Sequence, residues 1–442
     1  MTSEATPTRV PQRATLVLPS SGAFDSRAWR IASALVARGH AVTVLARHAD
    51  GLADDEMHTS GYRIVRVPVS ATEGLPVPLR WIVRRIRGGA QPPAGRSAPA
   101  LQNRASRAGR LRSGWSAVAR LAAIALTVRA QRFASRPVAP AADLVHAMAY
   151  MGIPIGLDLG RRDAAAVVYD ARDIYVDAAN VARLPDPARR LFGVVERRWA
   201  RQATRVVTVN EPYAEVMVQR FGITRPLIVM NCSYRRDLPA VPPRLLHERL
   251  GLVAATRIVL YQGGFSRDRG IEELIEALPS FPEGAVLVLL GYGSLEGELQ
   301  RRAAEPELAG RLFTLPAVSP SELLDWVGSA DVVAMPIQPT TLNHRLTTPN
   351  KLFEAMAAGV PVVASDLPGM AGIVRETGCG ILCDPTSPKA IAAAIRAVLD
   401  APEAERAAYR ERAIAAAHGR YSWETQMDIL LAEYGRLTGR PW

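Results

Sequence analysis

Several kinds of chemistry are missing from this chain of 442 residues. Its three cysteines, Cys232, Cys379 and Cys383, are too few for a disulfide framework and do not stand at zinc-binding spacing with histidine, so we expect a reducing, cytoplasmic environment. Nowhere do 18 apolar residues run without interruption, which argues against a membrane-spanning helix. The polar first residues have no apolar segment among them, so the sequence predicts no secretory signal.

The usual nucleotide and metal motifs are also missing. No G-x-G-x-x-G follows the first apolar strand, and the sequence contains no P-loop. In the second half of the chain no Asp-x-Asp stands at the end of a strand, so we expect no metal and no other cofactor. Lysine occurs only twice, at Lys351 and Lys389, although the formal net charge is +12.

What is present indicates a large globular protein. Hydrophobic residues make up 48% of the chain and charged residues 22%, which excludes a disordered or fibrous protein. The length is about three times that of a usual domain, so two large domains, with or without an insertion, are expected.

The positive charge is concentrated in an insertion that we place at residues 79–137. This segment holds thirteen arginines and no aspartate or glutamate. Its flanks, LRWIVRRIRG and WSAVARLAAIALTVRAQRF, are amphipathic, which is typical of basic helices that lie on an anionic membrane. A solvated loop and a helix packed on its own domain are the alternatives. No aromatic-interleaved or helix-turn-helix pattern favours nucleic acid as a partner.

Outside the insertion, apolar strands alternate with amphipathic helices. The pattern predicts an α/β fold with two doubly wound, Rossmann-like domains that face each other across a cleft. We place the first domain at residues 1–240 and the second at 250–420, with a proline-rich linker from Leu238 between them. A last helix begins near Trp423, in a segment placed at 421–442.

One candidate phosphate-binding turn lies in the second domain, in the sequence YQGGFSRDRGIEELIEA. Gly263 and Gly264 end a strand and allow a ligand to approach the backbone closely, and Arg269 precedes a helix. A solvated turn is the alternative. Gly291 and Gly293, in LLGYGSL, follow the next strand and are expected at the same edge of the sheet.

A second candidate strengthens the first. In TTPNKLFEAMAAG, Asn350 leads into a helix whose first residues include Lys351 and Glu354. A cation at a helix start is not favoured by the helix dipole, so Lys351 indicates an anionic ligand nearby. Glu354 has two carboxylate oxygens, which is typical of a group that holds a ribose diol. A surface carboxylate that caps its own helix is the alternative for Glu354.

In these motifs the chain resembles the retaining family 4 glycosyltransferases of the two-Rossmann (GT-B) type. The resemblance spans nearly the whole chain apart from the insertion, and its most specific segments are FDSRAWRIASALVARGHAVTVLA, DLVHAMAY, RVVTVNEPYAEVM, LYQGGFSRDRGIEELIEAL, LVLLGYGSLEGEL and PNKLFEAMAAGVPVVASDLPG. It implies that the second domain binds a nucleotide-diphosphate sugar and the first binds the acceptor. It also implies that the last helix crosses back to the first domain.

The resemblance assigns roles to residues of the second domain. Arg269 corresponds to the basic residue that holds the diphosphate, Asn350 and Lys351 to the turn at the phosphates, and Glu354 to the glutamate that holds the ribose. Val318 falls where the family contacts the base, and Gly291 and Gly293 match a glycine pair near the ligand. Two positions depart from the pattern: Leu346 stands where a first glutamate is usual, and Gly264 where many relatives have a second arginine.

In the first domain the resemblance points to His146, which matches the leading histidine of an H-x-H pattern in which Met148 replaces the second. His146 is the catalytic candidate there, beside Arg269, Lys351 and Glu354 in the second domain. A satisfied core histidine is the alternative. Further candidates on the acceptor side are Asp25, Arg27, Asp170 and Asp173.

Together these features predict a retaining hexosyltransferase that uses a UDP- or GDP-linked sugar and a lipid-linked or cell-surface glycan acceptor. It would be cytoplasmic, with the insertion on the inner face of the cell membrane. Two alternatives stay open. One is a related two-domain enzyme, such as a nucleotide-sugar epimerase or a glycan phosphorylase, and the other is a catalytically silent partner that binds a glycan or serves as a scaffold.

Overall fold

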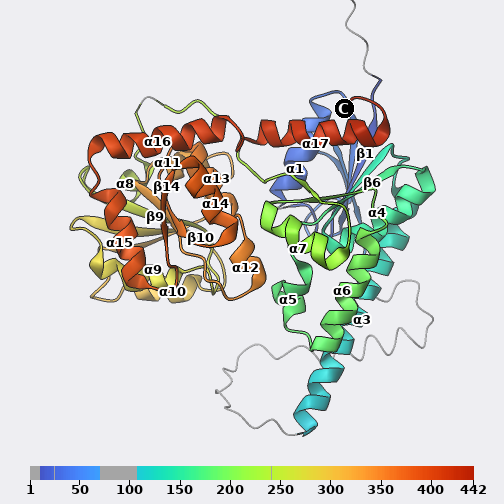
Figure 1. Ribbon diagram of the computed structural model, residues 1–442, viewed down its shortest axis with the longest axis horizontal. Helices are drawn as coiled ribbons and strands as arrows, with labels where there is room; N and C mark the ends of the chain where they lie inside the picture. The colour runs from blue at the N-terminus through green and yellow to red at the C-terminus, as the bar shows by residue number, and fades with distance from the viewer. Residues whose placement is uncertain (1–9, 24, 70–106, 240) are drawn as a thin grey trace, which may run out of the picture. The chain divides into compact units, whose positions relative to one another are not determined.

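The computed structural model describes residues 10–23, 25–69, 107–239 and 241–442, with the backbone alone for residues 107–121 and 179–180. The described chain divides into two units (Figure 1). Unit 1 comprises Met1–Thr208, Ala214–Leu227 and Leu430–Trp442, and unit 2 comprises Val209–Tyr213 and Ile228–Ile429. The proline-rich passage from Leu238, expected as a linker, therefore lies inside unit 2.

Unit 1 is built on a sheet of eight strands in the order β3-β4-β2-β1-β5-β6-β7-β8. The strands are β1 (Arg13–Val17), β2 (Ala41–Arg47), β3 (Asp55–Met57), β4 (Arg63–Val67), β5 (Leu144–Met148), β6 (Ala166–Asp170), β7 (Arg205–Thr208) and β8 (Leu227–Ile228). The helices along this part of the chain are α1 (Ser26–Val36), α3 (Arg107–Val138), α4 (Ala149–Asp163), α5 (Ala179–Ala182), α6 (Asp186–Ala200) and α7 (Glu211–Phe221). Short β3 pairs antiparallel with β4, whereas the pairs from β4 through β2, β1, β5 and β6 to β7 are parallel.

Unit 2 has a six-stranded sheet in the order β11-β10-β9-β12-β13-β14, with parallel pairing throughout. Its strands are β9 (Arg257–Gly264), β10 (Ala285–Tyr292), β11 (Leu312–Pro316), β12 (Val332–Met335), β13 (Val362–Ser365) and β14 (Gly380–Cys383). Its helices are α8 (Leu245–Leu250), α9 (Ile271–Ala277), α10 (Glu296–Ala303), α11 (Leu323–Gly328), α12 (Leu342–Leu346), α13 (Asn350–Ala357), α14 (Pro368–Thr377), α15 (Pro388–Leu399) and α16 (Glu403–His418). Helix α17 (Trp423–Thr438) has its first residues in unit 2 and its last in unit 1.

The sheet of unit 2 is buried on both faces because its strands are apolar at successive positions. Ile258 and Leu260 of β9 join the hydrophobic core with α11, α13, α14 and α16, whereas Val259 and Tyr261 join the core with α9, α10 and α15. Figure 1 shows these two groups of helices on opposite sides of the sheet. The strand order reverses between β9 and β12, and in doubly wound sheets ligands bind at the carboxyl ends of the strands at such a switch point. The prediction of two doubly wound α/β domains is confirmed.

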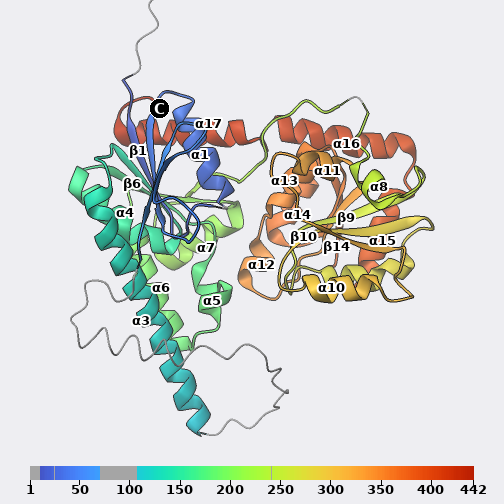
Figure 2. The same cartoon turned by 180° about the vertical axis from the view of Figure 1, so that it is seen from behind.

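Helix α3 contains the second half of the arginine-rich insertion. Within its described side chains, Val128, Ala130, Gln131 and Ser135 are buried, and Gln131 Nε2 donates to the carbonyl oxygen of Leu18 at 2.8 Å. Helices α3, α4 and α6 lie together in both views (Figures 1 and 2). This part of the insertion is therefore a helix packed on its own unit, one of the three interpretations left open. The first flank, at residues 79–88, lies outside the described residues.

Unit 1 depends on a close approach between α4 and the sheet. Gly152, Gly156 and Gly160 recur at four-residue spacing on α4 and face the strands. A Cβ at Gly156 would lie 2.6 Å from Cβ of Ala147, and one at Gly152 would lie 2.9 Å from the carbonyl oxygen of Val17. Glycine at these positions lets the helix backbone pack directly on β1 and β5.

We predict that Gly156→Ala lowers the free energy of unfolding by about 1–3 kcal/mol, because overpacking forces the helix and the strand apart. Gly193→Ala on α6 is the matched control, since its added Cβ would only make an ordinary contact of 3.4 Å with Val176. There we expect no loss, because alanine is the better helix former. Urea unfolding of both variants measures the difference, and equal stability of the two would contradict the packing argument.

Candidate functional site

The candidate donor site in unit 2 gathers at the carboxyl end of β9. Lys351 is the second residue of helix α13, and its Nζ lies 3.6 Å from the centre of the Tyr261 ring. Gly263 lies beside this ammonium group, since a Cβ at Gly263 would be 3.5 Å from Lys351 Nζ. Glu354, one turn along α13, accepts a hydrogen bond of 3.1 Å from Gln262 Nε2. The structure therefore brings Gly263, Lys351 and Glu354 together.

Lys351 is a buried amine whose positive charge is only partly compensated. Its Nζ is buried and has no hydrogen-bond partner among the described residues. Burial and the positive charge of Arg269 lower the pKa of Lys351 to about 7, against the opposing effect of the Glu354 carboxylate. Burial is the main cause that lowers the pKa of His344 on α12, and the positive charge of Arg269 lowers it further. Arg269, Lys351 and His344 therefore share one electropositive region, to which an anion would bind favourably.

Three glycines at the carboxyl edge of the unit 2 sheet allow a close approach of backbone segments. Gly270, with φ of +78°, directly precedes α9, and a Cβ there would lie 1.9 Å from the carbonyl oxygen of Pro336. Gly291 and Gly293 face the β9 turn in the same way, because their Cβ positions lie 1.9 Å from the Gly263 oxygen and 2.3 Å from the Phe265 oxygen. Only Gly264, of the glycines predicted for this site, has open space around its Cβ position.

Two further predicted residues lie at the border of this region. Asn350 is exposed, and its Oδ1 accepts a hydrogen bond of 3.1 Å from Asn231. Val318 follows β11 and is partly buried against the core. Asn350 directly precedes Lys351 in the chain. Val318 follows β11, which is the edge strand of the sheet and is separated from β9 by β10.

Leu346, where the resemblance implies a glutamate, has a structural role in the loop before α13. Its side chain is 9% exposed, and its carbonyl oxygen accepts a hydrogen bond of 2.6 Å from Asn210 Nδ2. Asn210 also donates to Thr348 Oγ1 at 2.9 Å, and Thr348 donates to the Gly369 carbonyl at 2.9 Å. These bonds fix the loop that leads into Asn350 and Lys351.

In unit 1, four of the five acceptor-side candidates meet at the ends of β5 and β6. Arg27 Nε donates to Asp170 Oδ2 at 2.6 Å, and His146 Nε2 lies 3.1 Å from the same oxygen. Asp25 caps the start of α1 and forms an ion pair with Arg172 at 2.9 Å. Asp173 is exposed on the turn that follows β6.

His146 is fully buried, and both of its ring nitrogens are hydrogen bonded. Because the Asp170 carboxylate can only accept, Nε2 donates to it, and Nδ1 lies 2.6 Å from the Tyr434 hydroxyl. Burial alone would raise the pKa of Asp170, but the charge of Arg27 and the hydrogen bond from His146 hold it far below the usual range. This geometry favours the alternative of a satisfied core histidine that orders the unit over direct contact with a substrate.

Several residues of these sites were missed in the sequence. Tyr261 and Gln262 directly precede the predicted Gly263, and this adjacency was a usable signal. His344, Asn210 and Tyr434 carry no such signal in the sequence. Tyr434, for example, stands 288 positions from its partner His146. Within the described part of the chain, no three His, Cys, Asp or Glu side chains gather in a group that could hold a metal ion. No described helix is long and apolar enough to cross a bilayer.

Two family descriptions match the chain. "Glycosyl transferase 4-like domain" matches residues 22–232, and "Glycosyl transferases group 1" matches residues 244–416. The chain belongs to the group 1, family 4-like glycosyltransferases. The prediction of this family from the sequence motifs is confirmed, and the candidate donor site lies within the second matched range.

Curated relatives of this glycosyltransferase include two D-inositol 3-phosphate glycosyltransferases. The one from Xylanimonas cellulosilytica is 29% identical over 270 residues, which cover 58% of this chain and 62% of the relative. The one from Geodermatophilus obscurus is 27% identical over 312 residues, which cover 66% of each. The chain thus spans less than two thirds of the length of these relatives.

Solved structures show the same fold at low sequence identity. Sucrose-phosphate synthase from Thermosynechococcus elongatus matches with a TM-score of 0.71 and 19% identity, over 97% of this chain and 99% of that one. HepE from Anabaena, in complex with UDP-glucose, matches with a TM-score of 0.65 and 18% identity, over 96% and 100%. WaaG, a glycosyltransferase involved in lipopolysaccharide biosynthesis, matches with a TM-score of 0.63 and 16% identity, over 96% and 100%.

We predict that Lys351→Met stabilises the protein at pH 7 by on the order of 4 kcal/mol. The unfolded chain holds the Lys351 proton up to a pKa of about 10.4, whereas the folded protein holds it only up to about 7. Stability therefore rises with pH between these two values, and the advantage of the variant shrinks as the pH approaches 9.5. Urea unfolding at pH 7 and pH 9.5 measures this change.

The control for this prediction is Lys389→Met, which replaces the only other lysine of the chain. Lys389 is exposed on α15, so we expect its replacement to change the free energy of unfolding little at either pH. An advantage of Lys351→Met that is the same at both pH values, or that Lys389→Met shares, would show that Lys351 is not a buried cation.

Proposed function

We propose that this glycosyltransferase moves a hexose from a nucleotide-diphosphate sugar, UDP- or GDP-linked, to a glycan or lipid-linked acceptor with retention of configuration. The observation that carries the proposal is the convergence of Arg269, Lys351 and Glu354 on the carboxyl end of β9, at the switch point of the unit 2 sheet. Two cations there match a diphosphate, and one carboxylate matches a ribose diol. The HepE structure with UDP-glucose supports a donor of this class.

In the proposed reaction the bond between the sugar C1 and the diphosphate oxygen breaks, and a bond from C1 to the acceptor oxygen forms. Negative charge develops on the diphosphate as it leaves, where Arg269 and Lys351 are fixed donors that stabilise it. The acceptor proton passes to the departing phosphate oxygen. Lys351 contributes most when protonated, and an adjacent diphosphate favours that form, so donor binding reverses the effect of burial on its pKa.

The acceptor side is proposed for unit 1. The ion-pair group of Asp25, Arg27, Asp170 and Arg172 orders the ends of β5 and β6, and His146 positions Asp170 within it. The relatives are named for D-inositol 3-phosphate, so phosphorylated inositol belongs in an acceptor screen beside lipid-linked glycans.

The donor site is tested by calorimetry with UDP, GDP and ADP. We expect one nucleotide to bind selectively at micromolar concentration, and Glu354→Ala and Arg269→Gln each to weaken it about tenfold, as expected for a lost hydrogen bond to a charged group. Glu298→Ala and Arg267→Gln are matched controls, because both side chains are exposed in unit 2 and Arg267 stands two residues from Arg269. No binding of any nucleotide, or equal losses in the controls, would contradict the proposal.

A catalytically silent partner is the second candidate function. It is favoured by the burial of Leu346 where a glutamate is implied and by the burial of His146. Selective nucleotide binding without sugar transfer to any acceptor of the screen would support this second candidate over the enzyme.

We also propose that the insertion at residues 79–137 contacts an anionic membrane surface from the cytoplasmic side. Support comes from the arginine-rich, acid-free segment and from the outer side of α3, where Phe133 is 78% exposed and Arg136 is exposed beside it.

Flotation with vesicles tests the membrane contact. We expect the protein to float with vesicles that contain phosphatidylglycerol and not with phosphatidylcholine alone. Replacing Arg80, Arg84, Arg85 and Arg87 by glutamine should reduce flotation, because each basic residue near the surface contributes about 1 kcal/mol. Equal flotation with both lipid compositions would contradict the contact.

A further inference from the structure

Unit 2 contains a pocket at the amino edge of its sheet, opposite the candidate donor site. The pocket has a volume of about 530 Å³, within the range of small-molecule sites. Arg257 is the first residue of β9, and Asp331 directly precedes β12, so this amino-edge pocket lies about 23 Å along β9 from Gly264. It therefore belongs to a different surface from the one that holds Lys351 and Glu354.

The pocket carries positive charge that a carboxylate offsets only in part. Of its three arginines, Arg257 forms an ion pair of 3.0 Å with Asp331, whose other oxygen accepts from the backbone N–H of Ile258. Among the described residues, Arg244 and Arg410 have no ion-pair partner. Arg244 donates one hydrogen bond of 3.3 Å to the Ala254 carbonyl, and Arg410 one of 3.4 Å to the Gly359 carbonyl. Each guanidinium has five N–H donors, so most of them remain available.

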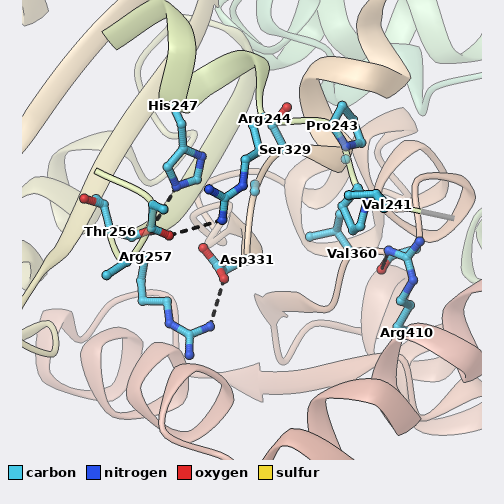
Figure 3. A pocket seen from close by; sticks show the side chains of 16 residues that line it. Val241, Pro243, Arg244, His247, Thr256, Arg257, Ser329, Asp331, Val360 and Arg410 are labelled. Carbon is cyan, nitrogen blue, oxygen red and sulfur yellow. Dashed lines mark hydrogen bonds and ion pairs between the residues drawn. The ribbon is translucent and has the colours of Figure 1, made fainter. Parts of the chain in front are cut away.

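A buried histidine adds an unpartnered group to the same wall. His247 is 9% exposed, and its Nε2 lies 3.0 Å from the Thr256 carbonyl oxygen, which can only accept. Nε2 therefore carries a proton and donates to this carbonyl. Nδ1 is buried and has no hydrogen-bond partner among the described residues. Figure 3 shows Arg244, His247 and Asp331 along one wall, and Arg410 beside Val241 and Val360 at another.

We propose that the amino-edge pocket is a second ligand site of this protein, and that its ligand is a small organic phosphate that carries hydroxyl groups. The planar donors of Arg244 and Arg410 suit phosphate oxygens, which arginine binds with two parallel hydrogen bonds. A hydroxyl group of the ligand satisfies Nδ1 of His247. Two guanidinium groups in one concavity also raise the local concentration of anions by their combined field.

The proposal does not rest on the proposed transferase activity, because the two sites share no residue. Arg244, His247 and Arg410 come from the segment before α8, from α8 and from α16, whereas the donor candidates stand at the ends of β9 and β10, in the turns that follow them, and in α13. Binding at one site is therefore separable from binding at the other by substitution.

Calorimetry with glucose 6-phosphate as the probe tests this site, with glucose and inorganic phosphate as its two fragments. We expect glucose 6-phosphate to bind, inorganic phosphate to bind more weakly, and glucose not to bind. Arg244→Gln and Arg410→Gln should each weaken the probe about tenfold. His247→Gln keeps an N–H for the Thr256 carbonyl and removes Nδ1, so it should weaken glucose 6-phosphate more than inorganic phosphate.

Two controls make the result specific. Arg249→Gln replaces an exposed arginine of α8 that does not line the pocket, and it should leave binding unchanged. Lys351→Met alters the donor site alone, and it should also leave the probe unaffected. The proposal would be overturned if glucose 6-phosphate did not bind at millimolar concentration. It would also be overturned if the folded Arg244→Gln, Arg410→Gln double variant bound the probe as tightly as the unchanged protein, or if Lys351→Met lost binding.

Discussion

Parallel strand pairing is the constraint on which unit 2 depends. It sets the carboxyl ends of β9, β10 and β12 along one edge, and the register places Gly291 opposite Gly263. The turns after β9 and β10 can approach each other only because residue 291 has no side chain, since a Cβ there would meet the Gly263 oxygen at 1.9 Å. That approach fixes the backbone against which Lys351 and Glu354 of α13 are placed.

The two units treat buried charge in opposite ways, and the contrast separates scaffold from binding site. In unit 1 the carboxylate of Asp170 is paired with Arg27 and hydrogen bonded to His146, so its charge is compensated by the protein itself. In unit 2 the ammonium group of Lys351 is buried against an aromatic ring without a hydrogen-bond partner among the described residues, near a second cation. A buried charge that is only partly compensated is costly, and a ligand of opposite charge removes that cost.

Partly compensated positive charge also lies at the amino edge of the same sheet. Arg244 and Arg410 have no carboxylate partner in the described chain, although Arg257 of the same pocket is neutralised by Asp331. One sheet therefore presents cations at both ends of its strands. The cations at the two edges belong to different loops and helices, so the polar residues around them also differ.

The sequence by itself determined the alternation of strands and helices, the two doubly wound domains and the motifs around Gly263, Lys351 and Glu354. These features are local, because burial on both faces of a parallel sheet requires continuous apolar strands and glycine requirements are set by single turns. Strands β3 and β4 escaped prediction, since β3 is three residues long with no buried position and β4 carries Arg63 and Arg66. Only the tertiary structure decided that His146 is a buried, satisfied side chain, that Gln262 holds Glu354 and that Arg244 and Arg410 share a pocket. These partners are far apart in the chain, and whether a polar side chain is paired or left open depends on which elements fold against it.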